Sequence, residues 1–246
     1  MPIVRSLVVV VIAACLCSVV LLGAVLAAEA APATATLAKR PDPALAPVED
    51  VPGLPRVLLI GDSISIGYTI PTRELLAGKA NVHRVPMNAG PTTRGLQQLE
   101  KWLRPGPWDV IHFNFGLHDL KHVDEAGVAV DAAKGHRQVE LQAYRDNLRA
   151  IVRRLKQTGA RLIWCSTTPV PEGAKGRMPG DELAYNAAAA EVMKQEGIEV
   201  NDLHAFATPR MAKLGKPADV HYTAQGSRAL AEVVAQRIEA ELPKPR

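Results

Sequence analysis

The sequence is poor in cysteine and in aromatic residues. It contains three cysteines and only 4% aromatic residues in 246 positions. Cys15 and Cys17 lie in an apolar segment near the N-terminus, so Cys165 is the only cysteine in the rest of the chain. One thiol cannot form an internal disulfide, and the fold must therefore rely on its hydrophobic core. Cys165 stands in an apolar run, which favours a buried small side chain over a nucleophile.

The sequence also lacks a concentrated charge of one sign. Its net charge is +4, and the 29 lysines and arginines are scattered, with the densest cluster at Arg153, Arg154 and Lys156. Nucleic-acid binding usually needs a concentrated basic face, so we predict no nucleic-acid partner. The motifs G-x-G-x-x-G and G-x-x-x-x-G-K-[ST] are absent, which argues against a nucleotide site.

A long uncharged segment is present near the N-terminus. Arg5 precedes the 22 uncharged residues Leu7–Ala28, and small residues flank Glu29 as in a cleavage site. We therefore predict that residues 1–30 are a signal peptide and that the protein is exported, to the periplasm or beyond. Two alternatives stay open. The segment is long enough for an uncleaved membrane anchor, and Ile12–Cys15 resembles a bacterial lipoprotein cleavage site.

A proline-rich segment follows the apolar one. Residues 31–55 contain six prolines, which prevent a helix and disfavour a central strand. This composition predicts a flexible or extended linker. The remaining residues, 56–242, are enough for one domain with a sizeable core.

Short apolar runs alternate with amphipathic segments in residues 56–242. The apolar runs predict five strands, at 56–62, 81–88, 108–117, 161–169 and 197–204. Helices are predicted at 138–157, 181–195 and 223–241 from apolar spacing or composition. This alternation favours an α/β fold with three layers, α/β/α, around a mostly parallel five-stranded sheet. Ligands bind such a sheet at the carboxyl ends of its strands.

A serine follows the first predicted strand. Ser63 stands in Gly61-Asp62-Ser63, where a strand passes into a helix whose N-terminus favours developing negative charge. A helix-capping serine would fit the same position. His221 lies two residues after Asp219 and just before the last predicted helix. An acid so close can hold an imidazole in one tautomer, so this pair is a candidate for the base and its acid.

Four separated motifs occur in residues 56–242. In chain order they are Gly61-Asp62-Ser63, Asn88-Ala89-Gly90-Pro91-Thr92-Thr93, Gly116-Leu117-His118-Asp119 and Asp219-Val220-His221. Together they resemble the four blocks of the SGNH hydrolase family, also called GDSL esterases. The resemblance implies a flavodoxin-like sheet and a serine hydrolase that needs neither a metal nor an organic cofactor.

The resemblance also implies roles for individual residues. Ser63 would be the nucleophile, His221 its base and Asp219 the orienting acid. The backbone N–H groups of Ser63 and Gly90 and the ring N–H of His118 would form the oxyanion hole. Further candidates for substrate binding are Asp62, Asn88, Asp119 and Tyr222.

Two positions depart from the family pattern. The third block usually has asparagine where this chain has His118, and the acid usually stands at the position of Ala218. A neutral imidazole can also donate one N–H, provided that Asp119 or a backbone carbonyl fixes its tautomer. In an extended segment, residues two apart point the same way, so Asp219 can still reach His221.

Together with the predicted export signal, the resemblance suggests an esterase that hydrolyses short acyl esters, above all acetyl esters, of a small molecule or a glycan. A non-catalytic binding domain with the same fold and an acyltransferase are the alternatives. His118 and His122 are four residues apart, but zinc would need at least one further ligand, so we predict no metal site. The only expected membrane contact is through the N-terminal segment.

Overall fold

The computed structural model describes residues 42–243. The predicted signal peptide, residues 1–30, and the first part of the predicted linker lie outside the described residues. Within residues 42–243, none of the helices is both long enough and apolar enough to cross a bilayer.

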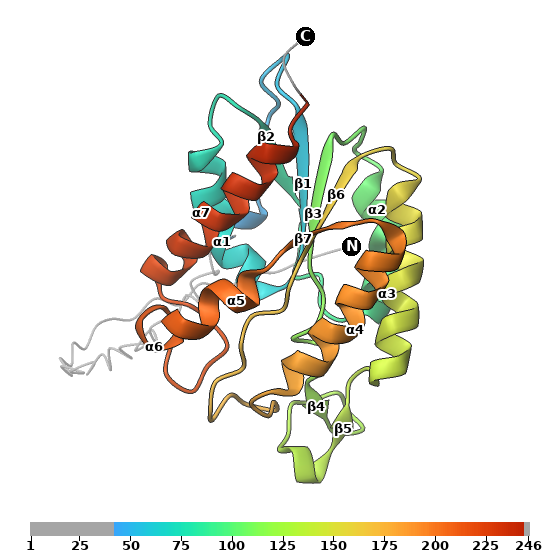
Figure 1. Ribbon diagram of the computed structural model, residues 1–246, viewed down its shortest axis with the longest axis vertical. Coiled ribbons are helices and arrows are strands. Elements are labelled where there is room, and N and C mark those ends of the chain that lie inside the picture. The colour runs from blue at the N-terminus through green and yellow to red at the C-terminus, as the bar shows by residue number, and fades with distance from the viewer. Residues whose placement is uncertain (1–41, 244–246) are drawn as a thin grey trace, which may run out of the picture. The chain divides into compact units, whose positions relative to one another are not determined.

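A five-stranded parallel sheet forms the centre of the domain (Figure 1). The spatial order is β2-β1-β3-β6-β7, and every neighbouring pair is parallel. The strands are β1 (Arg56–Ile60), β2 (Asn81–Arg84), β3 (Val110–Phe113), β6 (Arg161–Cys165) and β7 (Glu199–Asn201). The predicted fold class is confirmed. The strands are shorter than the apolar runs because several of these runs continue into loops at the carboxyl ends.

Helices cover both faces of the sheet. Figure 1 shows α1 (Ser63–Leu75) and α7 (Ala224–Glu241) side by side on one face, where they contact each other. The opposite face is covered by α2 (Thr92–Leu103), α3 (Leu141–Lys156) and α4 (Asp181–Glu196). The short elements are η1 (Pro43–Leu45), η2 (Ala132–Lys134), α5 (Leu203–Ala207), η3 (Thr208–Arg210) and α6 (Met211–Leu214).

The core lies between the sheet and these helices. In α3, the buried residues follow the helical spacing seen in the sequence: Tyr144, Leu148, Ile151, Val152 and Leu155 are completely buried. Burying one such side chain contributes about 1.5–3 kcal/mol. The prediction of Cys165 as a buried side chain is confirmed, since it is 2% exposed.

The second half of the predicted linker is held against the domain. Ala44 is buried, and Arg73 donates a hydrogen bond from Nη1 to the Pro43 carbonyl at 3.2 Å. The Asn81 side chain accepts from the Val51 N–H at 2.8 Å and donates to the Val51 carbonyl at 3.0 Å. The folded part therefore begins before residue 56, and residues 42–55 are not a free linker. These contacts depend on partners distant in the sequence, so the composition could not predict them.

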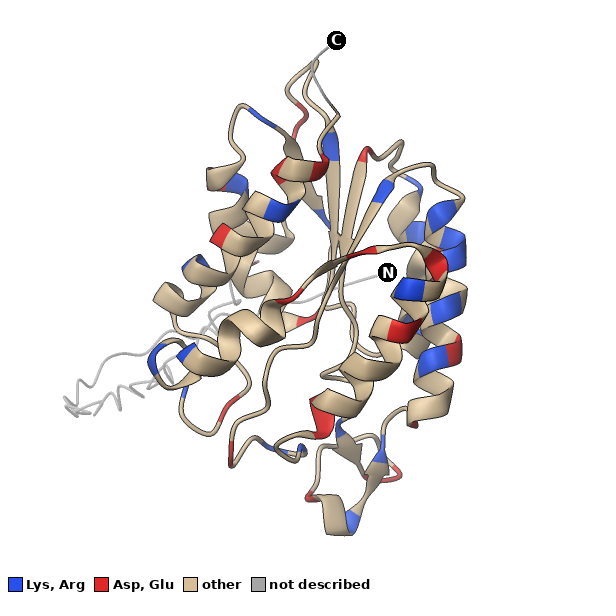
Figure 2. Ribbon diagram, viewed as in Figure 1, with Lys and Arg blue, Asp and Glu red and all other residues tan. Residues whose placement is uncertain are grey.

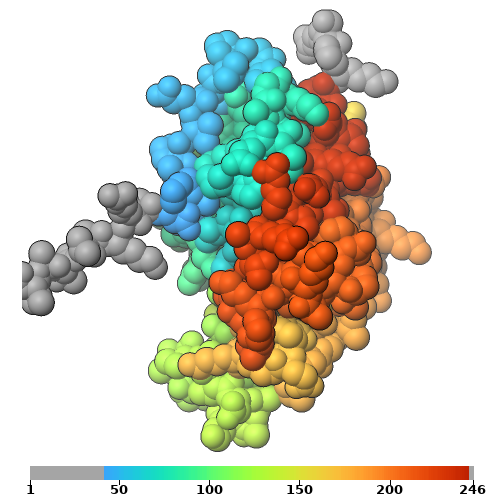
Figure 3. Space-filling view, turned by 90° about the vertical axis from the view of Figure 1, so that its left-hand side faces the viewer, coloured from blue at the N-terminus to red at the C-terminus, as the bar shows by residue number. Residues whose placement is uncertain are grey.

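A small hairpin that the sequence did not predict lies between β3 and α3. Its strands β4 (His122–Val123) and β5 (His136–Arg137) are antiparallel and have two residues each, too few for an alternation pattern. The His122 N–H donates to the Gly176 carbonyl at 2.7 Å. Figure 3 shows the hairpin (yellow-green) beside the light orange segment that contains residue 176.

A buried histidine on β3 should make the fold sensitive to acid. His112 is completely buried, its Nε2 lies 3.1 Å from Asn201 Nδ2, and burial lowers its pKa to about 3. Below about pH 6.5 the unfolded chain takes up a proton at this residue and the folded chain does not. We expect the free energy of unfolding to fall by about 1.4 kcal/mol per pH unit from this residue as pH decreases from 6.5 towards 3.

Urea titrations at several pH values between 4 and 7 would measure this slope. His112→Gln keeps a side chain that can accept from Asn201 but cannot take up the proton, so we expect a shallower pH dependence in that variant. Equal slopes in the two proteins would contradict the assignment.

Candidate active site

The start of α1 places Ser63 at the carboxyl end of β1. Asp62 is the N-cap of this helix, and its Oδ1 accepts from the Ile64 N–H at 2.9 Å. Ser63 is therefore not the capping residue, and its side chain is free for another contact. A Cβ atom at Gly61 would lie 2.7 Å from the Ser65 Cβ, so this turn requires glycine. Asp62 is 2% exposed, and its observed role is to cap the helix rather than to face a ligand.

Ser63, His221 and Asp219 form a continuous hydrogen-bonded row. The Ser63 Oγ lies 2.8 Å from His221 Nε2, and His221 Nδ1 lies 2.6 Å from Asp219 Oδ1. Ser63 and His221 are 158 positions apart in the sequence. The side chains of His221 and Asp219 are each 42% exposed, so the row lies at the surface. A carboxylate, an imidazole and a hydroxyl in this order can activate the hydroxyl as a nucleophile.

The loop before α7 holds His221 in place. The His221 carbonyl accepts from the Lys216 N–H at 2.9 Å, and the Thr223 N–H donates to the Leu214 carbonyl at 2.9 Å. Thr223 is also the N-cap of α7, since its Oγ1 accepts from the Gly226 N–H at 3.0 Å. Backbone hydrogen bonds at His221 itself and at Thr223, two residues later, therefore fix the segment that bears the imidazole.

Asp219 reaches His221 through a tight turn and not through the extended segment that the sequence suggested. Its Oδ1 accepts from the His221 backbone N–H at 3.1 Å as well as contacting the ring. Ala218, just before it, has φ of 52°, a left-handed conformation that is uncommon for alanine. Burial acts to raise the pKa of Asp219, but the hydrogen bonds from His221 and the charges of His221 and Lys216 lower it below its usual value. Asp219 is therefore an ionised partner at neutral pH.

The loop after β2 differs from the expected oxyanion hole. Gly90 has φ of 66°, a conformation that favours glycine, but its N–H donates to Asn88 Oδ1 at 2.9 Å. This N–H, predicted to be free for an oxyanion, is thus bound to the side chain of Asn88. Asn88 was predicted to bind substrate, and here it shapes the loop.

His118 lies half-buried in the loop after β3. Burial lowers its pKa to about 4, so the ring is neutral at pH 7 and carries one N–H. Neither ring nitrogen has a hydrogen-bond partner among residues 42–243. The expected fixing of the tautomer by Asp119 or by a backbone carbonyl is therefore not found.

Asp119 faces away from the site and anchors α2 instead. Its Oδ1 accepts from the Thr92 N–H at 2.8 Å and from the Thr92 hydroxyl at 2.5 Å, and the residue is completely buried. Burial raises its pKa to about 7 although the Thr92 bonds act to lower it. Asp119 was predicted to bind substrate, and in the structure its carboxylate is instead bonded to Thr92. Its bond to α2 holds the second and third blocks together.

Tyr222 and Asn114 are also committed to the interior. Tyr222 is 7% exposed, and burial raises its pKa to about 12, so it presents little surface to a substrate. Asn114 Nδ2 donates to the Cys165 carbonyl at 2.7 Å, so this asparagine does not replace the one absent at position 118. Tyr222 was a predicted substrate contact, and the structure instead packs it into the core.

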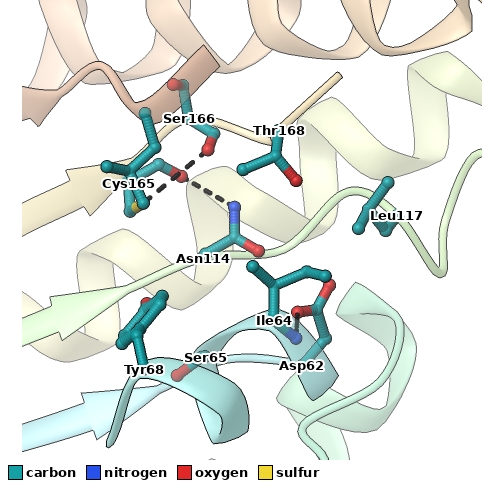
Figure 4. Close-up of a pocket in the computed structure, with 10 residues that line it drawn as sticks. Asp62, Ile64, Ser65, Tyr68, Asn114, Leu117, Cys165, Ser166 and Thr168 are labelled. Atoms are coloured by element: carbon teal, nitrogen blue, oxygen red, sulfur yellow. Dashed lines mark hydrogen bonds between the residues drawn. The ribbon is translucent and has the colours of Figure 1, made fainter. Parts of the chain in front are cut away.

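A small cavity lies behind the nucleophile turn and was not foreseen (Figure 4). Its volume is about 10 Å³, close to the room that one water molecule needs. Figure 4 shows most of the residues that line it, which come from α1, from the ends of β3 and β6 and from the loops beyond them. The lining residues are Asp62, Ile64, Ser65, Tyr68, Asn114, Leu117, Cys165, Ser166, Thr168 and Leu203. The cavity is too small for an acyl chain.

All three residues of the densest basic cluster in the sequence form ion pairs. Arg153 and Lys156 pair with Glu196, and Arg154 pairs with Glu100 at 2.5 Å. Figure 2 shows these basic residues of α3 next to acidic ones. In the part of the chain that the structure describes, no three His, Cys, Asp or Glu side chains gather as a metal-ligand set.

The model of the GDSL-like lipase/acylhydrolase family matches residues 59–229, which include all four blocks. None of the curated proteins compared with the chain matches it.

Several solved structures share the fold. A lipase/acylhydrolase from Enterococcus faecalis has a TM-score of 0.65 and 19% identity, over 78% of this chain and 99% of that one. The acetyl xylan esterase AlAXEase has a TM-score of 0.61 and 14% identity, over 74% and 99%. A catalytic mutant of an acetylxylan esterase from Geobacillus stearothermophilus has a TM-score of 0.60 and 16% identity, over 75% and 94%. With 70% of its length matched by one family model, the chain belongs to the GDSL-like lipase/acylhydrolase family.

Proposed function

We propose that the protein is a serine esterase that acts on short acyl esters. The observation that carries the proposal is the row from Ser63 Oγ through His221 to Asp219, with contacts of 2.8 Å and 2.6 Å. Ser63 and His221 are 158 positions apart in the sequence, so this contact requires the fold to hold two distant segments of backbone together. Membership of a lipase/acylhydrolase family supports the same chemistry.

In the proposed reaction, Ser63 Oγ attacks the ester carbonyl while His221 Nε2 takes the hydroxyl proton. The Asp219 carboxylate stabilises the imidazolium that forms. The tetrahedral oxyanion accepts hydrogen bonds from the Ser63 N–H at the start of α1 and from the neutral ring of His118. The Gly90 N–H joins them once it turns from Asn88 to the oxyanion. His221 then protonates the leaving alcohol, and water repeats the sequence on the acyl-enzyme.

Acetyl esters are the substrates we propose, with a glycan or a small molecule as the alcohol. The row lies at the surface, where the side chains of His221 and Asp219 are 42% exposed, and a short acyl group can reach it without a deep channel. Two solved structures with this fold are those of acetyl xylan esterases, which agrees with a short acyl group. We also propose that residues 1–30 direct the protein out of the cytoplasm. N-terminal sequencing of the mature protein would test the export signal.

A fluorophosphonate probe tests the proposed function directly. An active serine hydrolase is expected to carry one label at Ser63 and to hydrolyse p-nitrophenyl acetate. A protein with neither property would be a binding domain. Two observations favour that second candidate: the Gly90 N–H is bound to Asn88, and the His118 ring is not held by a hydrogen bond among residues 42–243. Product analysis with a sugar acceptor present would reveal acyl transfer in place of hydrolysis.

Removal of the acid should have only a moderate effect on the rate. The side chains of Asp219 and His221 are 42% exposed, so water screens their charges and can solvate the imidazolium. We expect Asp219→Ala to lower kcat about fivefold, in keeping with roughly 1 kcal/mol for a half-exposed charged pair. Steady-state kinetics on p-nitrophenyl acetate would measure it, with Asp131→Ala, far along the chain in an exposed turn, as the control. A loss of a thousandfold or no loss would both contradict this interpretation.

A further inference from the structure

Two arginines approach the proposed oxyanion hole from opposite loops. The guanidinium of Arg94 lies over Gly90, where a Cβ atom would be 2.9 Å from Arg94 Nη1. Arg177 Nε donates to the Leu117 carbonyl at 2.8 Å, which fixes the guanidinium next to His118. Arg94 comes from the first turn of α2 and Arg177 from the loop between β6 and α4. Two cations thus flank the place where the ester carbonyl would lie.

Lys121 adds a third positive charge. Its side chain lies against Gly176, where a Cβ atom would be 3.4 Å from Lys121 Cγ. Partial burial lowers the pKa of Lys121, and the charges of Arg177 and Arg94 lower it further. The same three charges act to lower the pKa of His118, beyond the effect of its burial. The three cations therefore lie close enough to repel one another.

None of these three cations forms an ion pair within residues 42–243, whereas many other lysines and arginines do. The two nearby acids, Asp62 and Asp219, already have other hydrogen-bond partners. Asp62 and Asp219 act to raise the pKa of Arg177, while its burial lowers it. However, Asp62 caps α1 and Asp219 is bonded to His221. Like charges close together without a counter-ion repel one another and destabilise a fold. A bound anion would relieve this repulsion, so a cluster of three cations favours an anionic ligand.

We propose that Arg94, Lys121 and Arg177 form a cationic rim that binds a carboxylate on the alcohol part of the ester. The inference rests on the proposed esterase function and specifies its substrate class. In a short acyl ester the alcohol is the larger group, so it is the part that extends from the serine to the rim. A guanidinium pairs well with a carboxylate through parallel N–H groups. The preferred substrate would thus be the acetyl ester of an acid-bearing alcohol.

Two esters of equal size test the rim. They are 3-acetoxybenzoate, which is anionic at pH 7, and 3-acetoxybenzamide, which is neutral. We expect a higher kcat/KM for the anionic ester, and a ratio that decreases as sodium chloride rises from 0.02 to about 0.5 M because salt screens exposed charges. The double variant Arg94→Gln/Lys121→Gln should lower the anionic-to-neutral ratio by about tenfold.

The controls separate the rim from other effects. Arg104, at the other end of α2, also has no ion-pair partner within residues 42–243. Arg104→Gln therefore removes a comparable cation far from the rim, and the anionic-to-neutral ratio of kcat/KM should stay as in the native protein. Arg177→Lys keeps the charge while it changes the geometry of the contact to Leu117, and should preserve most of the preference. A native ratio of one or less, or a ratio that the double variant leaves unchanged, would overturn the rim alone. If neither ester is hydrolysed, the proposed esterase function fails and the rim fails with it.

Discussion

Ser63→Ala is expected to abolish ester hydrolysis, lowering kcat by about four to six orders of magnitude. The hydroxyl is the only group in the row that can form the acyl-enzyme, and alanine leaves His221 and Asp219 without a proton to move. Because Asp62 and not Ser63 caps α1, the substitution removes no helix cap and the stability should stay within about 0.5 kcal/mol. Hydrolysis of p-nitrophenyl acetate and thermal unfolding, measured on the same samples, would test both parts.

Ser65→Ala is the matched control for this experiment. Ser65 lies two positions further along α1, is buried, and its Oγ accepts a hydrogen bond from Arg84 at 2.6 Å. Its loss leaves a buried cation with one partner fewer, so we expect about 1–3 kcal/mol of destabilisation with the chemistry retained. Ser63→Ala should therefore lose activity but keep its stability, whereas Ser65→Ala should lose stability but keep its activity. Full activity in Ser63→Ala would refute the proposed mechanism.

The second large effect is expected at the position where the chain departs from its family. His118→Ala should lower kcat by about 100- to 1000-fold, the usual cost of one lost oxyanion donor. His118→Asn should stay within about tenfold of the native rate, because its amide N–H can donate in the same place. The pKa of His118 is lowered to about 4, so both effects should be the same from pH 6 to pH 8.

His136→Ala provides the comparison for His118. His136 is an exposed histidine on the nearby hairpin strand β5, and we expect its loss to leave the rate unchanged. Equal rates in His118→Ala and the native protein would mean that backbone N–H groups alone stabilise the oxyanion. A high rate in His118→Ala with a low one in His118→Asn would exclude the role of donor altogether.

The sequence predicted the sheet and the row of three side chains, but not the surroundings of the site. Apolar runs mark strands that helices cover on both faces, and all five strands appear where they were expected, although the edge strand β7 is partly exposed. Ser63, His221 and Asp219 could be recognised because each stands beside an element boundary that the sequence marks. A motif at the end of a strand or the start of a helix can be located from the sequence, and its residue types then suggest the chemistry.

The differences from expectation concern the partners that polar side chains find in the fold. Asp119, Asn88 and Tyr222 have the right residue types for substrate contacts, but each is used by the fold: Asp119 anchors α2, Asn88 closes its loop and Tyr222 packs in the core. These outcomes depend on partners from other elements, which no spacing in the sequence reports. The cationic rim was missed for the same reason, since Arg94, Lys121 and Arg177 come from three separate loops or turns.

The contact between α1 and α7 has a consequence for the protein during its synthesis. The nucleophile belongs to the first helix after β1, whereas its base comes just before the last helix, 158 positions later. A growing chain carries the serine long before it carries the imidazole, and the two meet only when α7 docks on α1. A nascent or still unfolded chain thus has no activated serine. The esterase activity that we propose would therefore arise only when folding is complete, without any separate inhibitor.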